Sequence, residues 1–382
     1  MSLLTITVVT TSESFNLLRE DWTDLNEQSS KGTIFSSWEW LYTWWKTYHN
    51  DGQRKLYILT CYDQDKNLIG IAPFQILNNP KRYFPCSRQL LFLGSGETDG
   101  SMIFGEYMDL IIKVNHEEDV IDLFSNFLLK NKSLWDGIKF QILLEASHVA
   151  SLFQNKNEIE RQITPYGVRS VIDLPDSYKD YLMSLRKKMR SNITRVRKRL
   201  ENEQQFTIEK CDSLDEVHAS LNILADLNRE RRDAIQQSSM FKYKRFNQFH
   251  HSLADYLQPQ NKLRFNILRF NNEPVAALYS FVDKGMNHFY QTGFKVEYGQ
   301  RYSLISTMLT QEISASIENK GISQVNFMFS DDDTSYKVRF SSRTETLYNI
   351  AYEKNDLKSK LKLFIHQRIK SMIKKIKTLK KK

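Results

Sequence analysis

The stretch at residues 274–337 constrains the fold most, because its pattern changes between strand and helix several times. Two apolar runs, Val275–Val282 and Met286–Thr292, flank an Asp-Lys-Gly turn, which predicts a β-hairpin. After a loop with two glycines, apolar residues at helical spacing predict a helix over Ser303–Asn319, and Val325–Phe329 predicts another strand. A helix that opens after a strand offers unpaired N–H groups, so this stretch is a candidate phosphate site.

The bulk properties indicate two packed domains. The chain has 382 residues, with 41% hydrophobic and 12% aromatic residues, which is enough for two cores. Its three cysteines are scattered and form no Cys-x-x-Cys spacing, so we expect neither a disulfide framework nor a metal site. The first residues lack the pattern of a signal peptide, and no apolar run approaches the roughly 18 residues of a membrane span. We therefore expect a cytoplasmic protein.

The positive charge is concentrated in the last residues. The net charge is +9, but residues 356–382 hold ten Lys, one Arg and one Asp, so the rest of the chain is near −1. The basic balance is therefore no argument that the whole protein binds nucleic acid. Apolar residues at helical spacing predict a basic amphipathic helix in a tail at 353–382, which suits the surface of an anionic membrane. The alternatives are a helix docked on the body, or binding to an acidic polysaccharide or nucleic acid.

The first 174 residues are predicted to form one domain. Strands are expected at 3–9, 55–61, 68–76, 88–93, 107–112, 138–144 and 168–174, and helices at 12–27, 35–48, 117–130 and 148–153. The aromatic helix at 35–48 fits core packing, and a ligand-stacking surface is the alternative. The Gly-Ser-Gly loop at 94–101 is a weak phosphate signal without the Gly-Lys-Ser/Thr of a P-loop.

The second half begins after an Asp-Leu-Pro-Asp boundary at 173–176 and repeats the rhythm of the first. Strands are expected at 206–210, 263–270 and 344–352, and helices at 214–230 and 241–257, besides the elements of 274–337. Residues 178–200 predict one basic amphipathic helix or a helix pair, with eight Lys or Arg and no acid between 186 and 199. This basic face is either solvated or turned toward an anion. The matching element order predicts duplicated α/β (α+β) domains with mixed, largely antiparallel sheets.

Several segments of the second half resemble a known family. These are LRKKMRSNITRVRKRL, LNRERR, EPVAALYSFVDKGMNHFYQTGFKVEY and VNFMFSDDDTSYKVRF, and they are similar to the CelD/BcsL group of Fem-related GNAT acyltransferases. FSSWEWLYTWW, LIGIAPF and YMDLII look like the N-terminal half of such proteins. The resemblance implies two tandem GNAT-like domains, 1–174 and 175–352, with the acyl-CoA site in the second. It also implies acyl transfer to an amine or hydroxyl, in cell-surface polysaccharide or lipid-linked sugar biosynthesis.

The candidate donor site and leaving-group site come from this second domain. We expect backbone N–H groups to hold the donor's diphosphate, helped by the arginine side chain, at Gln300, Arg301, Tyr302 and Ser303. The resemblance implies a Tyr-Lys pair at Tyr336 and Lys337. In these roles Tyr336 protonates the leaving thiolate, and Lys337 holds a phosphate or an acceptor carboxylate. The alternative is a packed tyrosine and solvated cations.

The candidates for the general base are His288, Tyr290, Asp109 and Glu297. His288 and Tyr290 alternate on one predicted strand, so both can point into the same cleft, and histidine titrates in the suitable range. Asp109 is an acid in an apolar strand and either pairs with a cation or faces an interdomain cleft. A structural role is the alternative for each. The acidic loop at 331–333 is predicted to be solvated, since adjacent carboxylates rarely reach one cation together.

Two rival functions remain open on the sequence. A Fem-type transferase that uses aminoacyl-tRNA is supported by the basic helix at 178–200. A non-catalytic, membrane-associated scaffold is supported by three departures from the family pattern, at Asn326, Ser330 and Ser303, where Asp, Gly and a Ser-Pro-Gly loop are common.

Overall fold

The computed structural model describes residues 4–79, 87–203 and 205–355, and the predicted tail helix at 356–382 lies outside them. The first half contains β1 (Thr5–Val9), α1 (Ser12–Leu17), α2 (Arg19–Gln28), α3 (Trp38–Tyr48), β2 (Arg54–Tyr62), β3 (Leu68–Asn79), β4 (Ser87–Phe92), β5 (Ile111–Ile112), α4 (Glu117–Lys130), β6 (Gly137–Leu143) and β7 (Ile159–Asp173).

The second half repeats this order after two helices of its own. It contains α5 (Tyr178–Ser184), α6 (Lys187–Asn202), β8 (Phe206–Lys210), α7 (Leu214–Ala234), α8 (Lys244–Leu257), β9 (Leu263–Phe270), β10 (Glu273–Asp283), β11 (Met286–Phe294), α9 (Val296–Tyr302), α10 (Leu304–Glu318), β12 (Gln324–Ser330) and β13 (Arg343–Lys354). Short 3₁₀ helices lie at Ile34–Ser36, His49–Asp51, Lys132–Leu134, His148–Ser151, Met240–Lys242 and Tyr336–Arg339.

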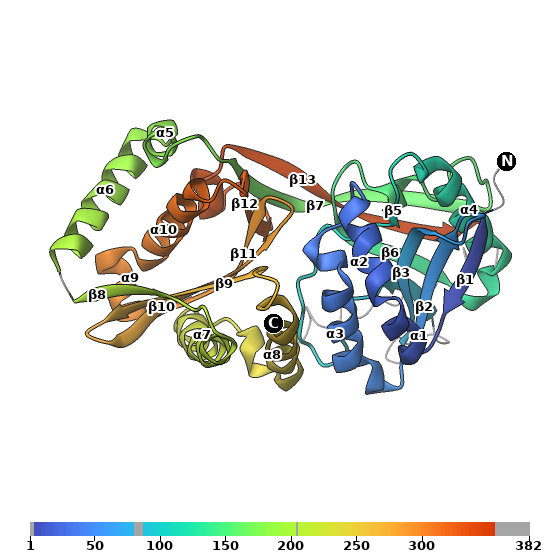
Figure 1. Ribbon diagram of the computed structural model, residues 1–382, viewed down its shortest axis with the longest axis horizontal. Helices are drawn as coiled ribbons and strands as arrows, with labels where there is room; N and C mark the ends of the chain where they lie inside the picture. Colours follow the sequence, from blue (N-terminus) through green and yellow to red (C-terminus); the bar gives the residue numbers. More distant parts are fainter. Residues whose placement is uncertain (1–3, 80–86, 204, 356–382) are drawn as a thin grey trace, which may run out of the picture.

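One continuous sheet joins the two halves (Figure 1). The strand order is β1-β2-β3-β4-β6-β13-β7-β12-β11-β10-β9-β8, with β5 beside β3. This order reads the same from both ends when β1 is matched with β8, β2 with β9, and so on to β13 with β7. The predicted α/β fold of two tandem halves on a mixed, largely antiparallel sheet is confirmed.

Each half contains one short parallel strand pair with a crossover helix. In the first half β4 runs parallel to β6, and α4 connects them. In the second half β11 runs parallel to β12, and α9 and α10 connect them. A parallel pair needs such a crossover, which explains the long apolar helices at these two points of the sequence.

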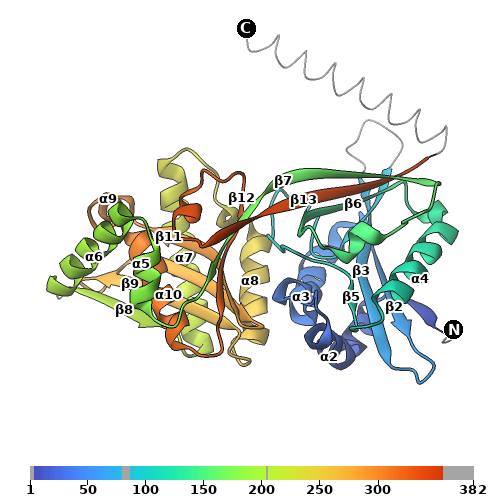
Figure 2. The same cartoon turned by 90° about the horizontal axis from the view of Figure 1, so that it is seen from above.

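The last strands of the two halves are exchanged. β7, from the first half, pairs with β12 of the second, whereas β13 pairs with β6 of the first. β7 and β13 also pair with each other from Val171 opposite Arg343 to Ile159 opposite Lys354, and they run together across both halves (Figure 2). The domain boundaries 1–174 and 175–352 stay a prediction, but the sheet of the first half includes a strand from residues 343–354.

Helices cover both faces of the second half's sheet. α7 and α8 lie on one face, and α10 with α5 and α6 lies on the other (Figure 1). The core under α7 and α8 is continuous with that of the first half, because α3 packs against α8. Trp38, Trp40 and Trp44 of α3 are buried, so the packing interpretation of this aromatic helix is confirmed.

Three local expectations were corrected or refined. The strand predicted at 107–112 reduces to Ile111–Ile112, and the basic stretch at 178–200 is a helix pair. The loop predicted before α10 contains α9, because Tyr298 and Tyr302 pack on Phe270. The Asp-Lys-Gly hairpin formed as predicted, with Asp283 opposite Met286. Within the described residues, no helix is both long enough and apolar enough to cross a bilayer.

Candidate active site

The parallel strands β11 and β12 stay paired over a short length only. Their pairing stops at His288 and Asn326, although β11 continues to Phe294 and β12 to Ser330. Met328 lies in the left-handed region with φ of 61°, and the pairing of β12 with β7 shifts register between Asn326 and Phe329. The Asn326 Oδ1 accepts the Met328 N–H at 2.9 Å and so stabilises this β-bulge. Beyond His288 and Asn326 the ends of β11 and β12 are therefore no longer paired with each other.

The start of α10 lies close to the end of β11, because Ile305 and Ser306 line one cavity together with Phe294. Its N-cap, Ser303, is in the left-handed region with φ of 48° and makes no capping hydrogen bond with its side chain. The first N–H groups of a helix have no partner within the helix, and the positive end of the dipole lies there. No acid stands in the first turn of α10, whereas Ser306 and Thr307 supply hydroxyl groups. The helix start is therefore chemically open to an anion.

A cavity of about 690 Å³ lies between β11, α10, the start of α6 and the 3₁₀ helix at 336–339; we call it the cationic cavity. Its described lining residues are Arg186, Lys188, Met189, Asn192, Arg231, Phe294, Ile305, Ser306, Tyr336, Arg339 and Phe340. Four of these are cations and none is an acid. Such a cavity attracts a multiply charged anion, and arginines suit phosphate oxygens through paired N–H groups.

Arg231 is held in place on the wall of this cavity. It belongs to α7, donates to the Thr292 hydroxyl at 3.2 Å, and lies 5.0 Å from the ring centre of Phe294. Burial lowers the pKa of Arg231, and nearby Tyr336 opposes that shift. The guanidinium of an arginine stays charged even so.

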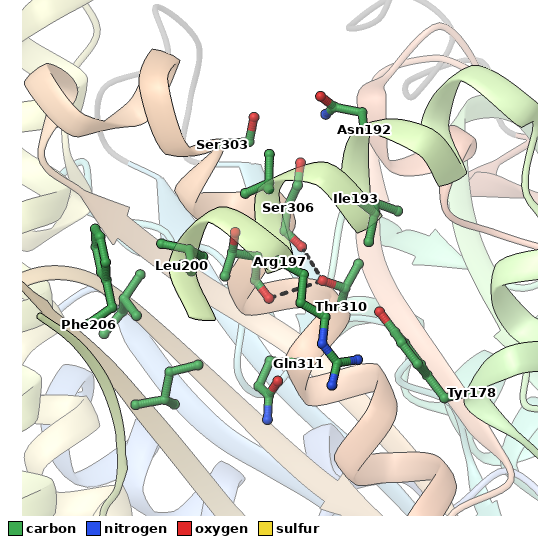
Figure 3. A pocket seen from close by; sticks show the side chains of 14 residues that line it. Tyr178, Asn192, Ile193, Arg197, Leu200, Phe206, Ser303, Ser306, Thr310 and Gln311 are labelled. Carbon is green, nitrogen blue, oxygen red and sulfur yellow. Dashed lines mark hydrogen bonds between the residues drawn. The ribbon is translucent and has the colours of Figure 1, made fainter. Parts of the chain in front are cut away.

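A second cavity, of about 210 Å³, lies between α6 and α10 and shares Asn192 and Ser306 with the cationic cavity. Figure 3 shows the polar side chains of α10 on one wall and α6 on the other, with Arg197 reaching toward Tyr178 and Gln311. Ile193, Val196 and Leu200 of α6 make its apolar side. The basic helix α6 therefore spans both cavities at the start of α10.

Of the predicted leaving-group residues, Tyr336 lines the cationic cavity and is 39% exposed. Burial raises the pKa of Tyr336, which Arg231 and Arg232 oppose, so its hydroxyl stays a proton donor near neutral pH. The Lys337 Nζ donates to the Phe329 carbonyl oxygen at 2.7 Å, at the end of β12. Burial lowers the pKa of Lys337, and Glu106 and Asp331 oppose the shift. The two residues therefore lie beside the cavity, but with different surroundings.

His288 and Tyr290 share a strand face, yet that face is packed against the first half and not open. His288 is 4% exposed, contacts Phe35 edge to face, and pairs through Nδ1 with the Asn326 amide at 3.1 Å. Burial lowers the pKa of His288 to about 3, with a contribution from Arg169. The expectation that this histidine titrates in the neutral range in a cleft is wrong, because burial keeps it neutral.

Tyr290 is buried as well, with its hydroxyl 3.4 Å from the His250 Nε2 and its ring near Trp40. Burial raises the pKa of Tyr290 well above its usual value, so it remains protonated. Its expected place in an open cleft is wrong for the same reason: it belongs to the core between the halves.

Asp109 also has a structural place. It is 3% exposed and accepts the backbone N–H groups of Leu110, His148 and Val149 at 2.7–3.0 Å. It thereby caps the 3₁₀ helix at 148–151 within the first half. Burial raises the pKa of Asp109, while His148 and these N–H groups oppose the shift. Backbone N–H groups and His148 surround it, so the expectation that Asp109 faces an interdomain cleft is wrong.

The predicted diphosphate residues divide into two groups. Gln300 and Arg301 lie in α9, and their side chains lie outside the described part of the structure. Tyr302 is buried, and its hydroxyl donates to Glu203 at 2.7 Å, whereas the prediction for this residue concerned its backbone N–H and stays a prediction. Ser303 lines the smaller cavity at the start of α10. Glu297 is exposed in the first turn of α9, and Asp332 caps Thr334 in the acidic loop.

Sequence reasoning named no individual cation of the cationic cavity as a site residue, and it missed one acid beside it. Arg231 belongs to the LNRERR segment, and Arg186 and Arg339 belong to segments that were quoted, but nothing in the spacing shows that they converge. Glu106 was missed although Asp109 nearby was considered. It is 2% exposed, and burial raises its pKa to about 7 against the effect of Tyr107, Lys337 and the Phe329 N–H. Among the described residues, no group of three or more His, Cys, Asp or Glu side chains could hold a metal ion.

One comparison with known proteins finds a match in this region. The family described as acetyltransferase (GNAT) domain matches residues 187–338, which run from α6 to the 3₁₀ helix that carries Tyr336. The resemblance is thus supported at the level of the GNAT domain, and the CelD/BcsL group stays a prediction. No curated protein sequence matches the chain.

Solved structures show the same fold over nearly the whole chain. FemX is similar with a TM-score of 0.62 at 10% identity, covering 95% of this chain and 100% of that one. L-PGS from Bacillus licheniformis is similar with a TM-score of 0.52 at 12% identity, covering 91% and 96%. A conserved protein of unknown function from Bacteroides thetaiotaomicron VPI-5482 is similar with a TM-score of 0.53 at 11% identity, covering 91% and 100%. At these identities the likeness concerns the fold alone.

Proposed function

We propose that the protein is an acyltransferase that moves an acyl group from acyl-CoA to an amine or hydroxyl acceptor. The observation that carries the proposal is the cationic cavity at the start of α10, most of whose lining residues belong to the region that matches a GNAT domain. Acyl-CoA carries a diphosphate and a third phosphate group, and four cations beside a helix start that has no side-chain cap and no acid suit that charge. Ser303, Ser306 and Arg231 are the first residues that would hold it.

The proposed chemistry is one direct transfer. The acceptor's nitrogen or oxygen attacks the thioester carbonyl, the new C–N or C–O bond forms, and the C–S bond breaks. Tyr336 is the proposed donor of a proton to the departing thiolate, because it is partly exposed at the cavity and remains protonated. Lys337 is proposed to add positive charge nearby. The proton of the acceptor's N–H or O–H group is proposed to leave to solvent water, because none of His288, Tyr290 and Asp109 is retained as the base.

The acceptor and the setting are proposals from the resemblance alone. A sugar-containing acceptor of cell-surface polysaccharide or lipid-linked sugar assembly is the first class to test. A cytoplasmic location, with the tail at 356–382 on an anionic membrane, would place the protein beside such acceptors. Flotation with anionic liposomes, with and without residues 356–382, tests this: equal flotation contradicts the membrane proposal.

The donor is tested by titrating coenzyme A and acetyl-CoA into the protein and measuring the heat of binding. We expect binding of the wild type and at least about tenfold weaker binding for Arg231→Met, since tenfold corresponds to about 1.4 kcal/mol. Arg229→Met is the matched control on the same helix, because Arg229 pairs with exposed Asp226 outside the cavity. Absence of binding by the wild type, or equal loss in both variants, contradicts the proposal.

A second candidate is transfer of an aminoacyl group from aminoacyl-tRNA, as in the Fem-type hypothesis. The likeness in fold to FemX, together with the basic helix α6 along the cavities, favours keeping it. This candidate predicts binding of aminoacylated tRNA with a steep dependence on salt, and no response to coenzyme A. A response to neither ligand leaves the non-catalytic scaffold.

A further inference from the structure

A carboxylate from the first half is buried against the candidate site of the second. Glu106 lies in the connection between β4 and β5 and is 2% exposed. Its two carboxylate oxygens accept the N–H of Phe329, in β12, at 2.8 and 3.1 Å. A buried carboxylate needs such compensation, since an unpaired buried charge is strongly unfavourable. The contact therefore joins the two halves at a fixed point.

The same residue, Phe329, is held from its other side by Lys337. The Lys337 Nζ donates to the Phe329 carbonyl oxygen at 2.7 Å. Phe329 directly follows the left-handed Met328 of the β-bulge, where ladder pairing with β7 resumes. An anion on the N–H and a cation on the carbonyl therefore hold the residue that fixes the strand end. Tyr336 directly precedes Lys337 in the chain and lines the cationic cavity. The hydrogen bond from Lys337 to Phe329 therefore also fixes the part of the cavity wall that Tyr336 forms.

The charged neighbours make Glu106 and Lys337 depend on each other. The titratable or charged groups around this pair are Tyr107, Arg169, Lys337 and Asp331, with Arg231 from α7. Arg169 is already paired with Glu345, at 2.6 Å from Nη2, and lies 4.7 Å from the ring centre of Tyr107. Burial raises the pKa of Glu106 to about 7 and lowers that of Lys337, and each group's charge favours the charge of the other.

We propose that Glu106 is a positioning residue of the transfer site: its carboxylate on the Phe329 N–H, opposite the Lys337 ammonium on the Phe329 carbonyl, holds the β12 bulge and with it the segment of Tyr336 and Lys337. In this proposal the first half supplies a residue, Glu106, that fixes the geometry of the site in the second half. This inference rests on the proposed function for the role of Lys337, whereas the electrostatic coupling of Glu106 and Lys337 does not depend on it.

The coupling is tested with Glu106→Gln, which keeps the shape of the side chain but removes its charge. Unfolded glutamate ionises near 4.5 and folded Glu106 near 7, so the folded state binds more protons between these values. The wild type must therefore lose thermal stability relative to E106Q as pH rises from 4.5 to 7. Melting temperatures of both proteins across pH 4.5–9 measure this. The same comparison in a Lys337→Met background isolates the coupling: loss of the Lys337 charge must raise the pKa of Glu106 further and move the loss of stability to higher pH. An unmoved profile in that background, or a constant difference at all pH values, overturns the proposal.

The positioning role is tested by release of coenzyme A from acetyl-CoA with hydroxylamine as the probe nucleophile, followed with a thiol reagent. Loss of the Glu106 charge destabilises protonated Lys337, so the decline of activity at high pH must move to lower pH by about one unit in E106Q. A uniformly lower rate with an unmoved pH profile indicates a merely structural role and overturns the proposal. If the wild type binds no coenzyme A, the proposed function fails instead, and the melting experiment still decides the coupling.

Discussion

The two halves share one architecture but differ at the point where a phosphate could bind. Each has a parallel strand pair, a crossover helix, and a non-glycine residue with positive φ in the following strand, Ile142 in β6 and Met328 in β12. The crossover helix α4 begins with Glu117, Glu118 and Asp119, whereas α10 begins with hydroxyl groups and no acid. The comparison teaches that the same order of elements carries opposite chemistry at the two helix starts: acids that repel an anion in the first half, and hydroxyl groups without an acid in the second.

The two halves also contribute different kinds of residue to the boundary between them. The first half contributes an aromatic helix, α3, and a buried carboxylate to the boundary, while the second contributes neutral histidines and tyrosines. The Gly-Ser-Gly loop of the first half, which was a weak phosphate candidate, is occupied by the protein itself. Arg54 donates to the Gly96 carbonyl oxygen at 3.1 Å and pairs with Asp51. The following variants test how deep this division goes, from the largest expected effect to the smallest.

The substitution Trp40→Ala tests whether the two halves unfold in a single cooperative transition. Trp40 is fully buried, and its ring contacts Phe249, Phe281 and Tyr290 of the second half. We expect a loss of about 3–5 kcal/mol in the free energy of unfolding, measured by urea denaturation, because a large cavity forms. Leu17→Ala, at an exposed site, is the control with little change. Two separate transitions, with only the first shifted, would show that the halves are independent.

His250→Phe concerns the neutral histidines on the second half's side. His250 is 1% exposed, and burial lowers its pKa to about 3 from 6.5. As pH falls below 6.5 the unfolded state gains the proton and the folded state does not, so stability is lost at up to about 1.4 kcal/mol per pH unit. Phenylalanine fits among the rings of Phe246, Phe249 and Tyr279. Because it cannot bind a proton, we expect the variant to lose less unfolding free energy on acidification than the wild type, by up to about 1.4 kcal/mol per pH unit. Parallel stability curves from pH 7 to 4.5 would contradict a buried neutral histidine.

Ser306→Glu makes the start of α10 resemble that of α4. Ser306 lines both cavities, so a carboxylate there opposes a bound anion. We expect calorimetry to show at least about tenfold weaker binding of coenzyme A. The new carboxylate repels the bound anion, and the interaction of one charge with a helix start is worth about 1 kcal/mol or more. Ser314→Glu, further along the same helix and outside the linings of both cavities, is the control. Equal affinity in S306E would place the anion elsewhere.

Glu118→Gln removes one acid from the first turn of α4. Acids near a helix N-terminus stabilise the helix, so we expect a loss of about 0.5 kcal/mol in thermal unfolding. Coenzyme A binding must stay unchanged if only the second half holds the donor. Tighter binding of coenzyme A by this variant would show that the start of α4 also binds an anion. The proposed difference between the two helix starts would then be contradicted.

Local chemistry made much of the fold predictable. The hairpin at Asp283–Met286 needs only its own residues, since Lys284 and Gly285 adopt positive φ in the turn. The capping serines of α3, α5 and α7, at Ser37, Ser177 and Ser213, act within three residues of themselves. The exchange of β7 and β13 depends on pairing between strands more than 170 residues apart, which no local pattern records.

The candidate site was less predictable than the fold for a related reason. Tyr336 was found through its segment, but His288 was misjudged because residue type reveals that a group can titrate and not whether it is buried. Glu106, Arg231 and Arg339 come from separate elements, and their convergence appears only in the tertiary structure. The basic stretch at 186–199 did signal an anion, although not that α6 would line two cavities.

The exchanged strands set an order of assembly on the ribosome. β6 is synthesised at residues 137–143, yet its partner β13 follows only at 343–354. Until then one edge of the first half's sheet stays bare and able to pair with another chain. The sheet edge at β6 therefore stays unpaired until residues 343–354 have been synthesised. The strand that then pairs with it, β13, also pairs with β7, which joins the sheet of the second half.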